Sequence, residues 1–360
     1  MHQELQTNIK FSSRSLGAVQ TYLKQKIYGQ DYAIDTIVNQ LSISVAGLGN
    51  PEKPLGSFLC MGPTGVGKTE LAKELAKVLN INFVRFDMSE YMDDSSVSNL
   101  IGSARGLVGS EEGGLLTNAI AKNPCSVLLL DEIEKADHKV LNLLLQIFDY
   151  GTLTDTLGRR VDFRNTIILL TSNVGATEKA TVGFASNSYD NKLRALCDLL
   201  LPELLARIDH IMEFNVLSKA MMQDIACKFL HQLQNKLKAQ RINLKYNDAV
   251  VEYLSAIGYE HKLGARGVSK VINQVITLPL SHQILSNAIK LNTKVMVEYT
   301  QEEGIIFNYL DKDFDRTPTL LDNEGNLWFD VCEDAFSYAK SNPGVVVKRS
   351  SNGRGFIIKQ

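Results

Sequence analysis

Short apolar runs alternate with longer segments of helical periodicity between residues 57 and 215. Four of these runs, at 57–61, 82–86, 126–130 and 166–171, are predicted strands because they are rich in branched and aromatic residues. After the first run, Leu71, Leu75 and Val78 fall on one side of a helix, and a similar stripe follows the third run. This alternation predicts an α/β fold in which helices cover a parallel sheet.

The rest of the chain changes character twice. From 216 to 290 apolar positions recur at helical spacing with almost no strand signal, which predicts a smaller helical unit. Beyond residue 300 the breaks are rich in glycine, asparagine and serine, and 326–331 and 355–359 are predicted strands. We therefore expect four segments, namely a polar helical lead-in, a large α/β subdomain, a small helical subdomain and a C-terminal α+β extension, over 1–26, 27–215, 216–300 and 301–360.

Composition and charge argue against several classes of function. Of the 360 residues 44% are hydrophobic, and the formal net charge of −2 offers no basic excess for nucleic acid or an anionic membrane. The longest apolar runs, such as 127–130, are far too short to span a bilayer. The five cysteines form no C-x-x-C pair, so reduced thiols and a cytoplasmic location are expected.

One glycine-rich segment carries a phosphate-binding pattern. Residues 62–69 match G-x-x-x-x-G-K-[ST] between a predicted strand and a predicted helix. Glycines let backbone N–H groups turn toward phosphate, and the helix presents its positive end to the same anion. Lys68 is expected to reach the β- and γ-phosphates, and Thr69 to ligate Mg²⁺. The pattern predicts ATP and Mg²⁺ as ligands of Gly62, Pro63, Thr64, Gly65, Val66, Gly67, Lys68 and Thr69.

Two acidic residues follow the third predicted strand. Asp131 is expected to hold Mg²⁺, and Glu132 to activate the attacking water as a general base. The fourth predicted strand ends at Ser172 and Asn173, and the Asn173 amide is a candidate to position that water. Taken alone, an asparagine at such a position is more often a turn residue.

Together these motifs identify a family. From residue 56 to about 300 the chain resembles the second ATPase module of the ClpA and ClpB unfoldases, within the AAA+ superfamily. The resemblance implies a P-loop AAA+ sheet followed by a small helical lid. The segments that carry it occur in the family's order, at 28–31 (YGQD), 62–69, 85–92 (RFDMSEYM), 128–136 (LLLDEIEKA), 151–155 (GTLTD), 162–165 (DFRN) and 264–266 (GAR).

The resemblance implies roles for single residues within one chain. Ile27 and Tyr28 would lie at the adenine pocket. Asp131 and Glu132 would form the Walker B pair, and Asn173 would be the residue called sensor one. These roles agree with what the residue types and their spacing predict for a nucleotide site.

Two arginines would complete the site from other parts of the structure. Arg207 stands at the position of the arginine finger, which reaches the γ-phosphate held by a neighbouring subunit, and Arg266 is sensor two on the lid. A helix-end salt bridge and a solvated cation are the alternative explanations for these residues. Gly267 stands where the family usually has proline. A finger supplied in trans implies a ring, in this family usually a hexamer.

The loop that grips substrate in this family departs from the usual pattern. The family reads Gly-Tyr-Val-Gly, whereas the chain reads Gly106, Leu107, Val108 and Gly109. Leu107 keeps an apolar contact but lacks the flat face of an aromatic ring.

A second loop bears on the choice of partner. The tripeptide Val182, Gly183 and Phe184 resembles the apolar-Gly-apolar signature by which ClpA, ClpC and ClpX dock onto the peptidase ClpP, and which ClpB-type disaggregases lack. A buried anchor is the alternative explanation for these residues.

The sequence thus predicts a Mg²⁺-dependent ATPase, a ring-forming Clp-type unfoldase that acts on protein substrates and delivers them to a ClpP-like peptidase. Two alternatives stay open, namely a regulatory or scaffold ATPase that does not thread its partner, which Leu107 favours, and a stand-alone ClpB-like chaperone. The neutral overall charge disfavours a nucleic-acid remodeller. The resemblance does not reach the extension over 301–360.

Overall fold

The computed structural model describes residues 13–102, 113–174, 188–260, 263–286, 289 and 293–310, together with four short strands between 320 and 359. The chain divides into two compact units, one comprising 1–221 with 263–266 and the other 222–262 with 267–360. The pore-loop residues 106–109 and the tripeptide 182–184 lie outside the described residues.

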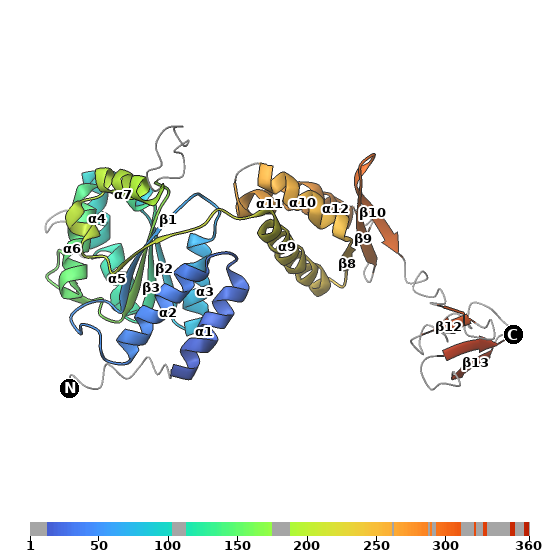
Figure 1. Ribbon diagram of the computed structural model, residues 1–360, viewed down its shortest axis with the longest axis horizontal. Coiled ribbons are helices and arrows are strands. Elements are labelled where there is room, and N and C mark those ends of the chain that lie inside the picture. Colours follow the sequence, from blue (N-terminus) through green and yellow to red (C-terminus); the bar gives the residue numbers. More distant parts are fainter. Residues whose placement is uncertain are drawn as a thin grey trace. The chain divides into compact units, whose positions relative to one another are not determined.

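A five-stranded parallel sheet forms the centre of the first unit (Figure 1). Its order is β2-β3-β6-β1-β7, and the strands are β1 (Gly56–Met61), β2 (Asn82–Asp87), β3 (Ser126–Asp131), β6 (Thr166–Ser172) and β7 (His210–Glu213). Every residue of β1, β3 and β6 is buried, as in sheets that are covered on both faces. The four strands predicted from the apolar runs are confirmed. The fifth, β7, was not predicted, because His210 and Glu213 flank only two apolar residues.

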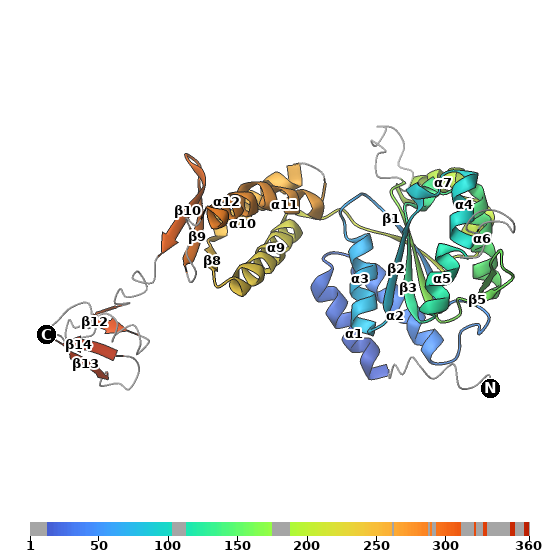
Figure 2. The same ribbon diagram turned by 180° about the vertical axis from the view of Figure 1, so that it is seen from behind.

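Helices cover both faces of this sheet (Figures 1 and 2). On one face α2 (Asp31–Val45) and α3 (Lys68–Leu79) pack against the strands, and α1 (Ser13–Lys26) packs against both helices. α1 buries Leu16, Val19 and Leu23, so the predicted lead-in is part of the unit from residue 13 onward.

The other face carries the larger apolar core. Buried side chains of β1, β3 and β6 pack there against residues of five helices. These helices are α4 (Asp94–Ile101), α5 (Leu115–Lys122), α6 (His138–Tyr150), α7 (Ser188–Leu199) and α8 (Pro202–Leu205). α6 begins after Asp137, whose carboxylate accepts the N–H of Lys139, and ends at Gly151 in the left-handed conformation.

Shorter elements connect the strands of the first unit. Single 3-10 turns follow the two acidic strand ends, and a small antiparallel hairpin follows α6. The turns are Met88–Glu90 and Ile133–Lys135, and the hairpin strands are β4 (Thr152–Thr154) and β5 (Arg160–Asp162).

The second unit combines helices with a three-stranded sheet. β8 (Asn243–Tyr246) pairs in parallel with β9 (Lys294–Thr300), which pairs antiparallel with β10 (Gly304–Leu310). The helical elements are most of α9 (Lys219–Ala239), α10 (Asp248–Glu260), α11 (Ala265–Ile272) from residue 267, a π-helical segment (Asn273–Thr277) and α12 (Leu278–Leu285). The predicted near-absence of strands over 216–290 is therefore wrong at β8, a short strand that buries only Leu244.

The C-terminal residues contribute a separate antiparallel sheet of order β11-β12-β14-β13. Its strands are β11 (Leu320–Leu321), β12 (Leu327–Phe329), β13 (Val346–Arg349) and β14 (Phe356–Lys359). β12 and β14 confirm the strands predicted at 326–331 and 355–359. The β9–β10 hairpin joins the segments that the sequence analysis separated at residue 300.

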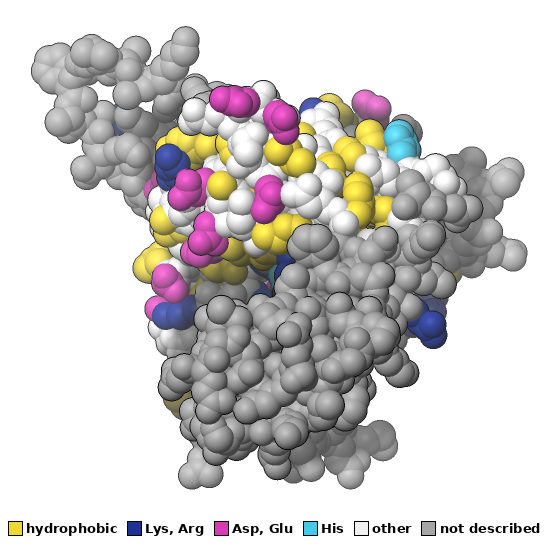
Figure 3. All heavy atoms as spheres, turned by 90° about the vertical axis from the view of Figure 1, so that its right-hand side faces the viewer, with side chains coloured by type: hydrophobic (Ala, Val, Ile, Leu, Met, Phe, Trp, Pro, Cys, Tyr) yellow, Lys and Arg dark blue, Asp and Glu magenta, His cyan; other side chains and the backbone are white. Residues whose placement is uncertain are grey.

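Two further properties of the described residues are the hydrophobicity of their helices and the charge of their surface. None of the described helices has the length and hydrophobicity needed to span a bilayer. On the face in Figure 3, acidic and hydrophobic side chains are interspersed among the described residues, and these residues form no broad basic patch there.

Candidate functional site: a phosphate loop facing two acids

The glycine-rich segment joins the end of β1 to the start of α3. Gly65 has a φ of +78°, and a Cβ atom at this position would lie 2.2 Å from the carbonyl oxygen of Leu263. The carbonyl of Gly65 accepts the N–H of Ala265 at 2.9 Å. Glycine is therefore required at residue 65 both for its backbone angle and for the close approach of 263–265. Gly67 precedes α3 at φ +109°, so the loop ends at the positive end of that helix.

Lys68 is the buried cation of the loop. Its ammonium donates to the carbonyl oxygen of Gly62, to that of Pro63 at 3.0 Å, and to Oδ1 of Asn173 at 2.9 Å. Burial lowers the pKa of Lys68 to about 8, and the nearby Asp131 carboxylate opposes this shift only in part. A weakly hydrated ammonium held in this way is well suited to receive an anion.

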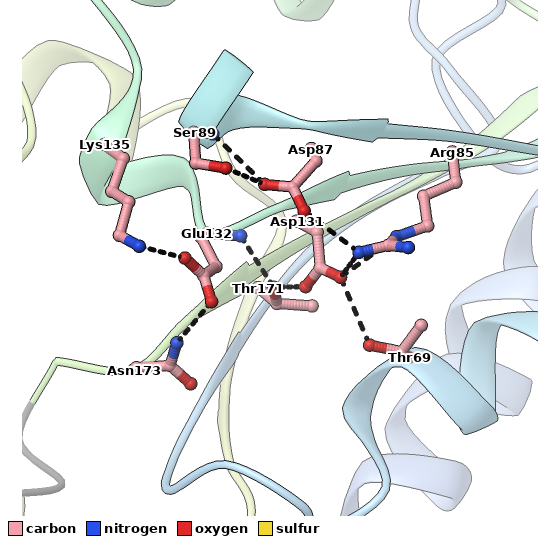
Figure 4. Close-up of polar contacts among 9 residues, drawn as sticks. All are labelled: Thr69, Arg85, Asp87, Ser89, Asp131, Glu132, Lys135, Thr171 and Asn173. Atoms are coloured by element: carbon pink, nitrogen blue, oxygen red, sulfur yellow. Dashed lines mark hydrogen bonds and ion pairs between the residues drawn. The ribbon is translucent and has the colours of Figure 1, made fainter. Parts of the chain in front are cut away.

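Asp131 lies opposite the loop at the end of β3 (Figure 4). Its Oδ2 is 3.4 Å from the hydroxyl of Thr69 and also accepts from Arg85, at 3.1 Å from Nε and 2.8 Å from the nearer terminal nitrogen. Its Oδ1 accepts the hydroxyl of Thr171, which lies on β6. The predicted pairing of Asp131 with the phosphate loop is therefore present, and Arg85 and Thr171 are additional partners.

Glu132 follows in a backbone conformation that is rare outside glycine, with φ +57° and ψ +52°. The Thr171 hydroxyl accepts its backbone N–H at 3.0 Å, which helps to fix this turn. Its carboxylate accepts the Asn173 amide at 3.3 Å and pairs with Lys135 at 2.5 Å. The carboxylate is thus aimed toward the same amide that Lys68 contacts (Figure 4).

Asn173 connects the two sides of the site. Its Oδ1 accepts from Lys68 and its Nδ2 donates to Glu132, while its backbone N–H donates to Oε1 of Glu134 at 3.0 Å. The second oxygen of Glu134 is buried and has no hydrogen-bond partner among the described residues. Glu134 therefore acts mainly on the main chain of Asn173.

Of the two residues predicted for the adenine pocket, Ile27 lies beside the loop. Ile27 is buried, and a Cβ at Gly67 would approach its Cγ2 to 3.5 Å. The neighbouring Gln30 is also buried and bridges the loop to the segment after β7. Its amide donates to the carbonyl oxygens of Val66 at 3.3 Å and Asn215 at 2.9 Å, and accepts the N–H of Asn215 at 2.8 Å.

The two predicted arginines have different surroundings. Arg266 belongs to the segment 263–266 that contacts the phosphate loop, and its charge helps to lower the pKa of Lys68. Arg207 instead pairs with Asp149 on α6, at 2.7 and 2.8 Å from the two carboxylate oxygens, and donates to the carbonyl of Glu203. The salt-bridge explanation for Arg207 thus describes its contacts within one chain.

Four residues of the site were missed by the sequence analysis. Arg85 and Gln30 lie inside segments that carry the family resemblance, so their presence there was the available signal. Lys135 lies one helical turn after Glu132, a spacing that favours an ion pair. Thr171 reaches Asp131 only because β3 and β6 are neighbours in the sheet, and no local pattern reports this.

Comparison with known families agrees with this geometry. The model of the AAA domain (Cdc48 subfamily) matches residues 53–211, and the model of the C-terminal, D2-small domain of ClpB protein matches residues 217–297. The chain is a Clp-family AAA+ ATPase module. The first match contains the phosphate loop, both acids and Asn173, and the second covers most of the predicted helical subdomain.

Individual Clp relatives cover most of the chain. A ClpA homolog protein of Fuscovulum blasticum is 41% identical over 279 residues, which are 77% of this chain and 35% of the relative. The chaperone protein ClpB of Chlamydia pneumoniae is 40% identical over 308 residues, 83% of this chain and 36% of the relative. ClpB of Clostridium tetani is 42% identical over 291 residues, 79% and 34% respectively. The matched part of the chain corresponds to about a third of the length of these relatives.

Proposed function

We propose that this module hydrolyses Mg²⁺-ATP at the 62–69 loop and uses the energy to remodel protein substrates. The observation that carries the proposal is the Asn173 bridge, which joins the phosphate-side cation Lys68 to the carboxylate of Glu132. A cation, an amide and a carboxylate in contact with one another are the groups that phosphoryl transfer to water requires.

The residues beside the loop fit nucleotide and metal. Thr69 and Asp131 present a hydroxyl and a carboxylate oxygen 3.4 Å apart, and such hard oxygen donors suit Mg²⁺, which usually keeps several waters. Bound there, Mg²⁺ supplies charge neutralisation for the phosphate oxygens. Lys68 and the N-terminus of α3 are proposed to bind the phosphates, and Ile27 and Tyr28 to line the adenine side.

Glu132 is the proposed general base. Its carboxylate accepts the proton of the attacking water, which the Asn173 amide orients. Lys135 pairs with Oε2 of Glu132 at 2.5 Å, whereas Oε1 faces the Asn173 amide, so Oε1 is the proposed proton acceptor. Arg266 adds positive charge from the 263–266 segment as negative charge develops on the phosphoryl oxygens.

The remaining cation is proposed to come from a second chain. Arg207 is committed to Asp149 and Glu203 of its own chain, and both members of the Arg207–Asp149 pair are about one-third exposed. An ion pair exposed to this extent costs little to open, so Arg207 is available to the phosphate of a neighbour in a ring, for which six subunits are proposed.

The decisive experiment is Glu132→Gln. The variant should bind a fluorescent ATP analogue as wild type does, while turnover of ATP falls about 10²-fold or more. Glu298→Gln is the matched control, because that carboxylate bonds to Asn308 on the β9–β10 hairpin and its loss should leave turnover unchanged. Wild-type turnover by Glu132→Gln would remove Glu132 from the mechanism.

Two uses of the remodelling activity remain to be separated. The tripeptide 182–184 favours delivery to a ClpP-like peptidase, whereas the match to the ClpB D2-small model favours a chaperone that works alone. Deleting 182–184 should abolish association with a ClpP-like peptidase and spare the ATPase. If wild type does not associate with such a peptidase in the presence of ATP, delivery is wrong and the stand-alone chaperone is retained.

A further inference from the structure

Among the described residues, Arg85 is the one cationic side chain that forms an ion pair with the candidate metal ligand Asp131. It stands on β2, two residues before Asp87, and the register pairs Asp87 with Asp131 on β3. Its guanidinium contacts Oδ2 of Asp131 through two nitrogens, at 2.8 and 3.1 Å, and Oδ2 of Asp87 at 3.2 Å. Figure 4 shows Arg85 approaching Asp131 from the same side as Thr69.

One oxygen of Asp131, Oδ2, faces both Arg85 and Thr69. Oδ2 of Asp131 is the atom nearest to the Thr69 hydroxyl, and it is also the atom that Arg85 occupies. The other oxygen accepts from Thr171, so a metal held near Thr69 has to compete with a guanidinium for Oδ2. Two cations at one carboxylate oxygen repel each other, which makes simultaneous occupation unfavourable.

The two partners differ in their freedom to move. The Asp131 side chain is 9% exposed and is fixed by Thr171, whereas the Arg85 side chain is 43% exposed. Asp87 is a second carboxylate within reach of Arg85. Its Oδ1 accepts from Ser89, and its Oδ2 already accepts from Arg85. The guanidinium can therefore leave Asp131 and keep an anionic partner.

We propose that Arg85 is a positioning residue that holds Asp131 until Mg²⁺-nucleotide arrives and then transfers to Asp87. This inference rests on the proposed nucleotide site and adds a cost that only the metal-bound form of the nucleotide has to meet. Metal-free nucleotide needs no displacement of Arg85. The chain therefore binds Mg²⁺-nucleotide less tightly, relative to metal-free nucleotide, than the same site would without Arg85.

The test is the ratio of two equilibrium dissociation constants for a fluorescent, slowly hydrolysed ATP analogue, measured on the full chain in excess EDTA and in saturating Mg²⁺. In Arg85→Gln the ratio of the EDTA constant to the Mg²⁺ constant should rise about three- to tenfold. Because metal-free ATP is more negative than Mg²⁺-ATP, the loss of any nearby cation also raises this ratio, so the competition further predicts that the constant in Mg²⁺ itself falls in Arg85→Gln. Arg85→Lys, which makes a single-point contact, should raise the ratio less.

Arg164→Gln is the matched control. Arg164 is about as exposed as Arg85 and pairs with Asp162 at 2.6 Å in the turn between β5 and β6. Its ratio should equal that of wild type.

Three outcomes overturn the proposal. An unchanged ratio in both Arg85 variants, including equal weakening of both constants, excludes competition with the metal. A lower ratio assigns Arg85 to the support of bound metal, and a higher ratio that arises only from weaker binding in EDTA assigns the change to the loss of charge. If wild type binds the analogue under neither condition, the proposed function itself fails, which is distinguishable from binding with an unchanged ratio.

Discussion

The cationic side chains at the carboxyl edge of the sheet and at the corner between α6 and α8 have different kinds of partner. At the edge, Lys68 and Arg85 contact groups of the same site, and the acid that Arg85 meets is 9% exposed. At the corner, Arg207 is bound to Asp149, which is 32% exposed and belongs to no other contact of the site. The difference is the basis of our proposal that one chain supplies phosphate and metal binding, and that the last cation for turnover comes from a second chain.

The largest loss of ATP turnover is expected from a substitution at the corner between α6 and α8. Arg207→Ala is expected to lower ATP turnover about 10³-fold, because a cation that stabilises the phosphoryl group in the transition state is lost. The dissociation constant of the ATP analogue should stay within about twofold, since Arg207 has no contact with the phosphate loop among the described residues.

Mixing two inactive variants sharpens this prediction. In mixtures of Arg207→Ala with Glu132→Gln, some sites combine an intact Glu132 with an intact Arg207 from the neighbour, so part of the turnover should return. If Arg207 and Glu132 acted within one chain, the mixture would be as inactive as its components. Light scattering on each variant checks that assembly is retained.

The carboxyl edge is tested by Lys68→Met. This substitution removes the buried ammonium and its contacts to Pro63 and Asn173, and nucleotide affinity should fall about 10²-fold. Equilibrium binding of the ATP analogue measures the effect. Near-normal affinity would mean that phosphate is held elsewhere, and the contrast between the two regions would be lost.

The smallest effect concerns stability at alkaline pH. Because burial lowers the pKa of Lys68 to about 8 from an ordinary value of 10.5, the unfolded chain binds more protons than the folded chain between these two pH values. The free energy of unfolding of nucleotide-free wild type should therefore rise, relative to Lys68→Met, by about 1–3 kcal/mol as pH increases from 8 to 10.5. Paired urea titrations measure this difference, and a fall would contradict the assigned charge state.

Local patterns were enough to predict the parallel sheet and the phosphate loop. Buried strands such as β3 are continuous apolar runs, and the glycine spacing before Lys68 is dictated by backbone approach. β7 and β8 have four residues each and were missed, because their pairing with long strands, rather than their own composition, stabilises them.

The missed side chains of the site share a different cause. Thr171 and Arg85 contact Asp131 from neighbouring strands, so their roles depend on strand register and not on distance along the sequence. Gln30 contacts Asn215, which lies 185 residues further along the chain, so no local pattern reports this contact either. A sequence motif indicates which groups lie on one turn, but it does not indicate which strand lies beside that turn.

The sheet order has a consequence for biosynthesis. β1 leads directly into the phosphate loop, yet its two neighbours in the sheet are β6 and β7, and the hydroxyl of Ser57 donates to Asp209 at 2.7 Å. Ribosomes release the amino-terminal part first, so β1 leaves the exit tunnel well before either neighbour exists. Until residue 172 has been translated this apolar strand lacks both neighbours, and until residue 213 it lacks one, so a nascent chain at that stage exposes a strand edge to which chaperones can bind.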